Sequence, residues 1–390
     1  MTELKITNYT YINPITLKFH VEHTDSSFLN AIRRIMMGQV PTIGFRTEYG
    51  KESDIKILKN TAALHNEFLA HRLSLLPIHY NYTKIDEFDS NKLLFILQKK
   101  NNTNRIMDVT TEDIDVKDIS KDPHVIMPKT FRDTLFPRDT ITGDYILINK
   151  LKPSKSGMSD EGEELDITMK ATIGTGNEHA LFCPTCVAIF SNVEDPEKVE
   201  IGFQSLIDKK NSKRTGNPLT KEEIDKERRS FNILDAARHF FTDERGEPNK
   251  FEFVIETDER IPSHIILLTA LDIFKNHITK FSENVKDKEK IEIYNSNCIM
   301  NSYDLVIEDE DYTLGYLLQY YIYKLYKNVE TPVVNYIASN VPHPLENKLV
   351  FRVGMVETST NPEALRTLFV NTCEVIKKDI TNFRLQISSQ

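Results

Sequence analysis

The sequence predicts an α+β protein made of two related strand–helix units that pair within one chain. Residues 21–36, VEHTDSSFLNAIRRIM, share a pattern with residues 307–322, IEDEDYTLGYLLQYYI. Residues 251–262, FEFVIETDERIP, likewise resemble residues 351–362, FRVGMVETSTNP. Repeated supersecondary units usually bury their apolar faces against each other. We therefore expect an intramolecular pseudo-dimer, which is a scaffold that needs no active site.

The first unit begins with an alternating strand over residues 15–22 and a helix that starts at the cluster Asp25-Ser26-Ser27 and stops before Pro41. One face of this helix is apolar and another is polar. A second helix is expected at about 62–76. The apolar face carries Phe28, Ile32, Ile35 and Met36, the polar face carries Asn30, Arg33 and Arg34, and the second helix places Leu64, Phe68, His71 and Leu75 on one line.

The later helices carry apolar stripes that suit packing between the two halves. They follow the strands that end at Pro262 and near residue 356, and another helix begins at Thr313 after a strand at 303–308. Strands are also expected near 333–337 and 348–356. The predicted internal interface comprises Phe28, Ile32, Ile35, Leu267, Leu271, Phe274, Leu314, Leu317, Leu318, Tyr321, Leu365 and Phe369.

The first unit also carries an insertion. Asp25 lies much farther from its counterpart Asp311 than Pro262 lies from Pro362. Short strands such as 93–97 and 145–148 alternate with polar loops between them, and the mixed-charge segment 208–229 is expected to be an exposed loop with a short helix. We expect a discontinuous first unit (1–81 and 169–281), a mostly β inserted domain (82–168), a linker or helix extension (282–302) and a second unit (303–390).

Composition excludes several classes of protein. The net charge is -9, so the chain lacks the dense basic surface that binds nucleic-acid phosphates. No apolar run is long enough for a membrane span, and the start, MTELKITNYTY, lacks a secretory signal. Four cysteines indicate a reducing compartment without a disulfide framework. We expect an intracellular protein.

Two motifs have a chemical and a structural interpretation. Cys183 and Cys186 form a C-x-x-C, which could serve a thiol-dependent or metal enzyme, but Cys298 and Cys373 are distant and the segment leads into a strand. The structural interpretation is therefore favoured. The acidic run 308–311 precedes a helix, where capping and the helix dipole favour negative charge over a metal site.

The motifs together resemble the alpha-like assembly subunits of multisubunit DNA-dependent RNA polymerases. Residues 26–45 and 60–78 are similar to the two signatures of the large alpha-like subunit, and 174–185 resembles its G-x-G-x-E-H-A segment. Residues 251–274 resemble that subunit's closing strand and helix. Two later segments, DYTLGYLLQ (311–319) and VPHPLENKLVFRV (341–353), resemble signatures of the small alpha-like subunit, which is the partner of the large one.

The resemblance implies a non-catalytic platform that docks the largest and second-largest polymerase subunits and small accessory subunits. It places Arg33 and Arg34 near the contact with the second-largest subunit. Asn30, on the same helix face, and Arg72 are expected to join this surface, while His71 is expected in the core and Glu67 as an internal counter-charge. Guanidinium groups pair well with partner carboxylates. The alternatives are an enzyme using Cys183 and Cys186 and a free-standing interaction protein.

The two alpha-like subunits are normally separate chains, and their fusion is a habit of large nucleocytoplasmic DNA viruses. The resemblance therefore implies a viral source, with the complex in the virion and the host cytoplasm or nucleus. Many large alpha-like subunits bind zinc or an iron–sulfur cluster through cysteines in the inserted domain. Residues 82–168 contain no cysteine, so no cofactor is expected, and the tethered pair is expected to be a monomer without a membrane or sequence-specific DNA contact.

Overall fold

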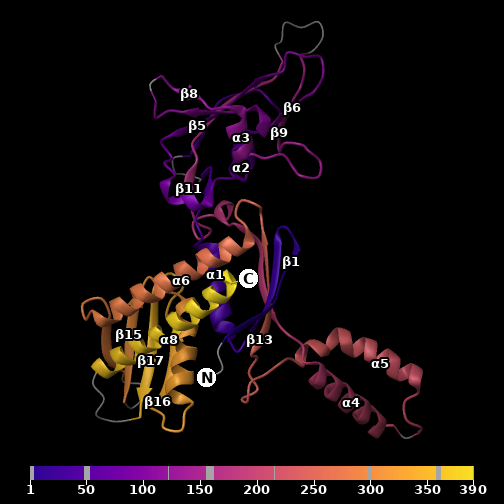
Figure 1. Ribbon diagram of the computed structural model, residues 1–390, viewed down its shortest axis with the longest axis vertical. Helices are drawn as coiled ribbons and strands as arrows, with labels where there is room; N and C mark the ends of the chain where they lie inside the picture. The colour runs from indigo at the N-terminus through magenta and orange to yellow at the C-terminus, as the bar shows by residue number, and fades with distance from the viewer. Residues whose placement is uncertain are drawn as a thin grey trace. The chain divides into compact units, whose positions relative to one another are not determined.

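The computed structural model (Figure 1) divides the chain into two compact units. Unit 1 consists of residues 1–36, 187–256 and 263–390, and unit 2 consists of residues 37–186 and 257–262. The structure describes residues 4–47, 53–121, 123–154, 162–214, 216–296, 301–356 and 362–389. Cys298 and residues 357–361 of the second repeat lie outside the described residues.

The first half of unit 1 is a four-stranded sheet with two helices. The strands are β1 (Lys5–Asn13), β2 (Thr16–Glu22), β12 (Thr185–Asn192) and β13 (Lys250–Thr257), in the order β1-β2-β13-β12. Helix α1 (Ser26–Gly38) follows β2, and α6 (Ser263–Lys286) follows β13. The predicted strand and helix at the start of the chain are confirmed, whereas β1 was not expected because its exposed residues show little apolar alternation.

The second half of unit 1 repeats this topology. Its strands are β14 (Glu292–Ser296), β15 (Ser302–Glu308), β16 (Val334–Asn340) and β17 (Lys348–Met355), in the order β14-β15-β17-β16. Helix α7 (Tyr312–Ile322) follows β15 and runs into a π-helical turn at Tyr323–Lys327, and α8 (Pro362–Ser388) comes after β17. Equivalent strands thus occupy equivalent places in both sheets, so the α+β two-unit fold predicted from the repeats is confirmed.

Two segments of unit 1 differ from the expected loops. Residues 208–229 belong largely to α4 (Pro196–Ser212) and α5 (Lys221–Leu234), which form a helical hairpin between β12 and β13 (Figure 1). Phe203 and Phe231 give this hairpin a small core of its own, with ring centroids 5.5 Å apart. The segment is highly charged and has few apolar residues, so the sequence pattern did not predict its helical core positions. Helix α6 continues to Lys286, as the helix-extension alternative predicted, whereas β14 occupies part of the region expected as a linker.

Unit 2 is mostly β. One sheet has the order β4 (Ile55–Asn60), β10 (Glu164–Met169), β5 (Leu93–Lys100), β7 (Ile114–Asp118) and β8 (Val125–Ile126). Two smaller ladders pair β3 (Thr42–Gly44) with β11 (Thr172–Gly174) and β6 (Met107–Thr110) with β9 (Leu147–Leu151). The helices are α2 (Asn66–Ser74) and α3 (Lys129–Leu135). This unit contains the proposed insertion 82–168 together with flanking residues on both sides.

Candidate functional site

The long helices of the two halves pack along each other in unit 1. Helices α6 and α8 lie side by side (Figure 1). The ring centroids of Phe281 and Phe369 lie 6.5 Å apart. The ring centroid of Phe28 in α1 lies 5.7 Å from that of Phe274 and 6.2 Å from that of Phe383. Aromatic pairs at these distances add to the stabilisation from apolar burial. All the residues predicted for the internal interface are buried: Phe28, Ile32, Ile35, Leu267, Leu271, Phe274, Leu314, Leu317, Leu318, Tyr321, Leu365 and Phe369.

Polar contacts at the rim of this apolar core also join the two halves. Arg384 of α8 forms a bidentate pair with Asp272 of α6, at 2.7 and 3.0 Å. Farther along α6, His277 Nε2 lies 2.8 Å from Glu310 Oε1. The hydrogen bond that His277 donates to the Glu310 carboxylate raises the pKa of His277 above its ordinary value. Charge-assisted pairs have a defined geometry, so they fix the positions of the helices along each other, which non-directional apolar contacts do less strictly.

The predicted polar face of α1 is divided between two roles. Arg34 Nη2 lies 2.9 Å from Asp311 Oδ2, so this arginine pairs with the second half of the chain. Asp311 also caps α7, because its Oδ1 accepts the backbone N–H of Thr313 at 2.7 Å. Arg33 donates from Nε and Nη2 to Asn30 Oδ1 at 3.1 and 2.9 Å. The expected capping by the acidic run is confirmed at Asp311.

Helix α2 of unit 2 presents an apolar and basic surface. Phe68 and Leu75 are 68 % and 54 % exposed, and His71 is exposed beside them. The expectation that His71 is a core residue is wrong. Leu69 and Leu73, not the predicted line of residues, face the core of unit 2. The register differs because several apolar residues on this helix compete for the core, and its sequence alone does not choose between them.

Arg72, also on α2, donates from Nη2 to the backbone oxygen of Leu147 at 2.8 Å. Its side chain is exposed, as is that of Glu67. Arg72 belongs to unit 2, whereas Asn30, Arg33 and Arg34 belong to unit 1. The four residues predicted for a partner contact are thus supplied by both units.

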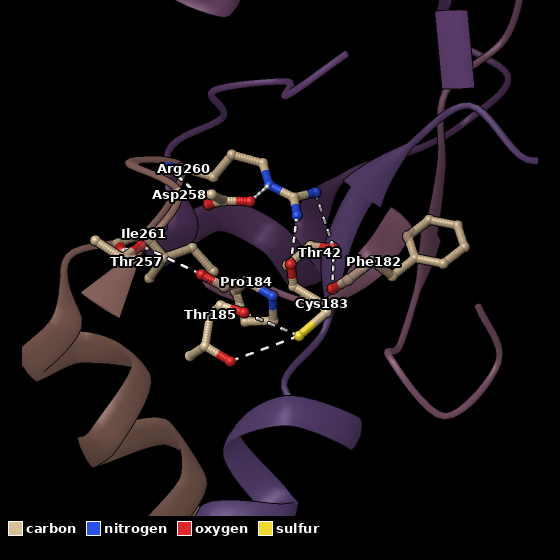
Figure 2. Close-up of polar contacts among 9 residues, drawn as sticks. All are labelled: Thr42, Phe182, Cys183, Pro184, Thr185, Thr257, Asp258, Arg260 and Ile261. Carbon is tan, nitrogen blue, oxygen red and sulfur yellow. Dashed lines mark hydrogen bonds and ion pairs between the residues drawn. The ribbon is translucent and has the colours of Figure 1, made fainter. Parts of the chain in front are cut away.

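The C-x-x-C segment is part of a hydrogen-bonded junction within unit 2 (Figure 2). Arg260, whose side chain is only 6 % exposed, pairs through Nε with Asp258 Oδ2 at 2.6 Å. Its other nitrogens donate to the backbone oxygen of Cys183 at 2.8 Å and to Thr42 Oγ1 at 3.3 Å (Figure 2). Thr42 in turn donates to the backbone oxygen of Phe182 at 2.7 Å.

This junction assigns a structural role to the sequence around the cysteines. The Cys183 thiol donates to the backbone oxygen of Thr185 at 3.3 Å, and Thr257 Oγ1 lies 3.3 Å from the backbone oxygen of Pro184 (Figure 2). Within the described ranges, no group of three or more His, Cys, Asp or Glu side chains is arranged to hold a metal ion. Sequence reasoning missed Arg260, although its place in the TDERIP segment next to the second repeat was a usable signal.

Comparisons with known proteins fit this arrangement. Residues 18–278 and, separately, residues 302–385 match the RNA polymerase Rpb3/Rpb11 dimerisation domain. The first match alone spans most of the chain. The protein belongs to the RNA polymerase Rpb3/Rpb11 dimerisation-domain family. The first match includes most of the first half of unit 1 together with unit 2, and the second match covers most of the second half of unit 1.

Relatives of this dimerisation-domain protein include subunits of DNA-directed RNA polymerases. The chain is 25 % identical to subunit 3B of DNA-directed RNA polymerases IV and V of Arabidopsis thaliana, over 70 % of this chain and 89 % of the relative. It is 26 % identical to subunit Rpo3 of Methanobrevibacter smithii, over 67 % and 92 %. A conjugation stage-specific protein of Tetrahymena thermophila is 25 % identical over 49 % of this chain and 60 % of its own length. In the part of the chain that the structure describes, no helix is long and apolar enough to cross a bilayer.

Proposed function

We propose that this chain is the non-catalytic assembly platform of a multisubunit DNA-directed RNA polymerase. The observation that carries the proposal is the presence of two dimerisation domains with the same strand order, whose helices α6 and α8 bury a common apolar face. A platform of this kind positions other subunits, and nucleotide addition takes place in those partners. The cysteine alternative loses support because the Cys183 segment is held in a structural junction.

The fused arrangement and its biological setting belong to the same proposal. Large and small alpha-like halves in one chain suggest a viral polymerase that works inside the host cell and is carried in the virion. Tethering gives pairing an effective concentration on the order of millimolar, so the halves do not need to find each other in solution. We therefore propose a monomer rather than a homo-oligomer, with no cofactor of its own.

For the second-largest subunit we propose contacts at Asn30, Arg33 and Arg34 of unit 1 and, separately, at Arg72 of unit 2 with the exposed Phe68 and Leu75 beside it. Apolar side chains surrounded by polar and basic ones are typical of protein interfaces. Arg34 holds Asp311 within the chain, so its contribution to docking is combined with an internal one. Phe68 is the cleaner probe, because Arg72 also donates to the backbone oxygen of Leu147 within unit 2.

Copurification tests the proposal. The tagged chain, expressed in its native source, is expected to bring two very large polymerase subunits with it. Charge reversal by Arg72→Glu combined with Phe68→Ser is expected to weaken capture of the second-largest subunit about tenfold or more, the loss expected for interface hot spots. The matched control Leu345→Ser alters another strongly exposed apolar residue. Unchanged capture by the α2 variant removes that surface from the proposal, and absence of polymerase subunits from the wild-type preparation removes the function.

A further inference from the structure

One pair of equivalent positions in the two halves of unit 1 carries residues of different charge. Asp25 and Asp311 both cap the helix that follows, with Oδ1 accepting a backbone N–H at 2.6 Å (Ser27) and 2.7 Å (Thr313). The residue nine positions after Asp311 is Tyr320, and the residue nine positions after Asp25 is Arg34. Arg34 pairs with Asp311 across the pseudo-twofold arrangement, at 2.9 Å. The equivalent arrangement on the other side places a tyrosine, not an arginine, near Asp25.

A pocket of about 420 Å³ lies at this second position, and Asp25, Glu247, Tyr316, Tyr320 and Tyr323 are among its lining residues. None of the residues that line it carries a positive charge. Within the described part of the chain, neither of its two carboxylates forms an ion pair with a lysine or arginine. The cavity is far larger than one water molecule, whose share of liquid volume is about 30 Å³.

The surroundings of the pocket are negative and incompletely hydrogen-bonded. Burial raises the pKa of Tyr320, and the charges of Asp25 and Glu247 raise it further, so its hydroxyl stays neutral. Ser27 Oγ, which also lines the pocket, is buried and has no hydrogen-bond partner among the described residues. A buried hydroxyl without a partner costs free energy unless a water molecule or a ligand in the pocket satisfies it.

Three cations lie near the pocket without lining it. Arg245 faces Asn328, whose side-chain oxygen, suitably oriented, accepts from Nε at 2.8 Å. The ammonium of Lys324 lies 5.7 Å from the centre of the Tyr320 ring, and that of Lys327 lies 5.5 Å from the Tyr323 ring. These contacts show that the tyrosine rings are placed to receive cations, and they leave the two carboxylates available.

We propose that this pocket receives an arginine side chain from a partner polypeptide. A guanidinium group can bridge Asp25 and Glu247 through charge-assisted hydrogen bonds and stack on a tyrosine ring. At the equivalent position, the chain's own Arg34 makes this kind of contact with Asp311. The partner's arginine thus completes the pseudo-symmetric pattern, and the proposal does not depend on the polymerase assignment.

Two peptides test the proposal on the full chain. The probes are acetyl-Gly-Arg-Gly-amide and its citrulline analogue, which has the same shape without the charge, and binding is measured by saturation-transfer NMR. We expect the arginine peptide to bind and the citrulline peptide not to bind. The variant Asp25→Asn with Glu247→Gln keeps the helix cap, because asparagine also caps well. We expect it to weaken arginine-peptide binding at least about tenfold, since charge-assisted hydrogen bonds are lost.

The pseudo-symmetric control is Asp311→Asn, which removes the partner of Arg34 and should leave peptide binding unchanged. Equal binding of the citrulline peptide, or unchanged binding by the Asp25 and Glu247 variant, overturns the proposal. If the arginine peptide binds only after Arg245→Ala, the chain's own arginine fills the pocket and the proposal also fails. In the purified native complex, a photoreactive residue at Tyr316, which is 52 % exposed, should cross-link within a few residues of a partner arginine.

Discussion

At the residue scale, the glycines of the G-x-G segment allow close backbone contact. A Cβ added at Gly176 would lie 2.0 Å from the backbone oxygen of Met37, and one at Gly174 would lie 2.4 Å from the Phe182 ring. Real Cβ atoms do not approach backbone oxygens this closely. The glycines therefore serve packing within unit 2, and they do not form a phosphate-binding loop.

We expect Gly176→Ala to destabilise unit 2 by about 2 kcal/mol, because a backbone oxygen cannot move aside as a side chain can. The measurement is the urea concentration at the midpoint of unfolding. Gly216→Ala is the matched control, since nothing lies near the added methyl group there. Equal midpoints for the two variants would show that the close approach is relieved at little cost.

Arg260 is the other residue whose loss should be costly. We expect Arg260→Ala to destabilise the protein by about 3 kcal/mol, because it leaves the Asp258 carboxylate and the Cys183 carbonyl without their buried partner. Arg238→Ala removes an arginine that is 78 % exposed and pairs with Asp235, so it should cost well under about 1 kcal/mol. Thermal unfolding of both variants is the test, and similar losses would contradict a special role for Arg260.

At the element scale, the length and regularity of a helix decide whether its buried face can be predicted from the sequence. The α6 and α8 stripes are long and regular, so their buried faces follow from helical periodicity alone. Helix α2 is short and has apolar residues on several sides, so the exposure of Phe68 was not predictable. The α4–α5 hairpin was missed because its two core phenylalanines are separated by many charged residues.

The contact between α6 and the start of α7 should depend on pH. The pKa of His277 is higher in the folded chain than its ordinary value near 6.5, because Glu310 accepts a hydrogen bond from it. Its stabilising contribution is therefore fully present at lower pH and is lost as the pH rises through the folded-state pKa. We expect His277→Gln to remove this part of the pH dependence, which lies above the ordinary histidine pKa of about 6.5, an effect below about 1 kcal/mol for a partly exposed pair.

The difference between wild type and variant isolates this contribution, because His79 in unit 2 acts in the opposite direction. Burial lowers the pKa of His79, so its protonation on acidification disfavours the folded state. The measurement is the unfolding midpoint of both proteins at several pH values. Parallel curves for wild type and His277→Gln would exclude a role for the His277–Glu310 contact.

At the scale of the whole molecule, the two halves of unit 1 should hold together without a covalent connection. A protease site inserted between Lys288 and Glu289, in the exposed turn after α6, allows the chain to be cut there. We expect the fragments to stay together in size-exclusion chromatography, because they share the apolar contact of α6 and α8.

The control for this experiment is the same cut in a Phe281→Asp variant, which places a charge in the contact between α6 and Phe369 of α8. A buried unpaired charge is strongly unfavourable, so these fragments should separate. Separation of the wild-type fragments would show that the tether, not the shared core, holds the halves together. Sedimentation of the uncut chain as a homodimer would contradict the proposed monomer.

The sequence by itself determined the repeated α+β units, the capping role of Asp311 and the apolar stripes of the long helices, because each depends on residues close together in the chain. Only the tertiary structure decided that Arg34 pairs with Asp311, which lies 277 positions away, and that Asp25 borders a pocket instead. It also decided that Arg260 fixes the cysteine segment. Such contacts depend on how elements far apart in the sequence pack together, and local periodicity and propensity do not specify that packing.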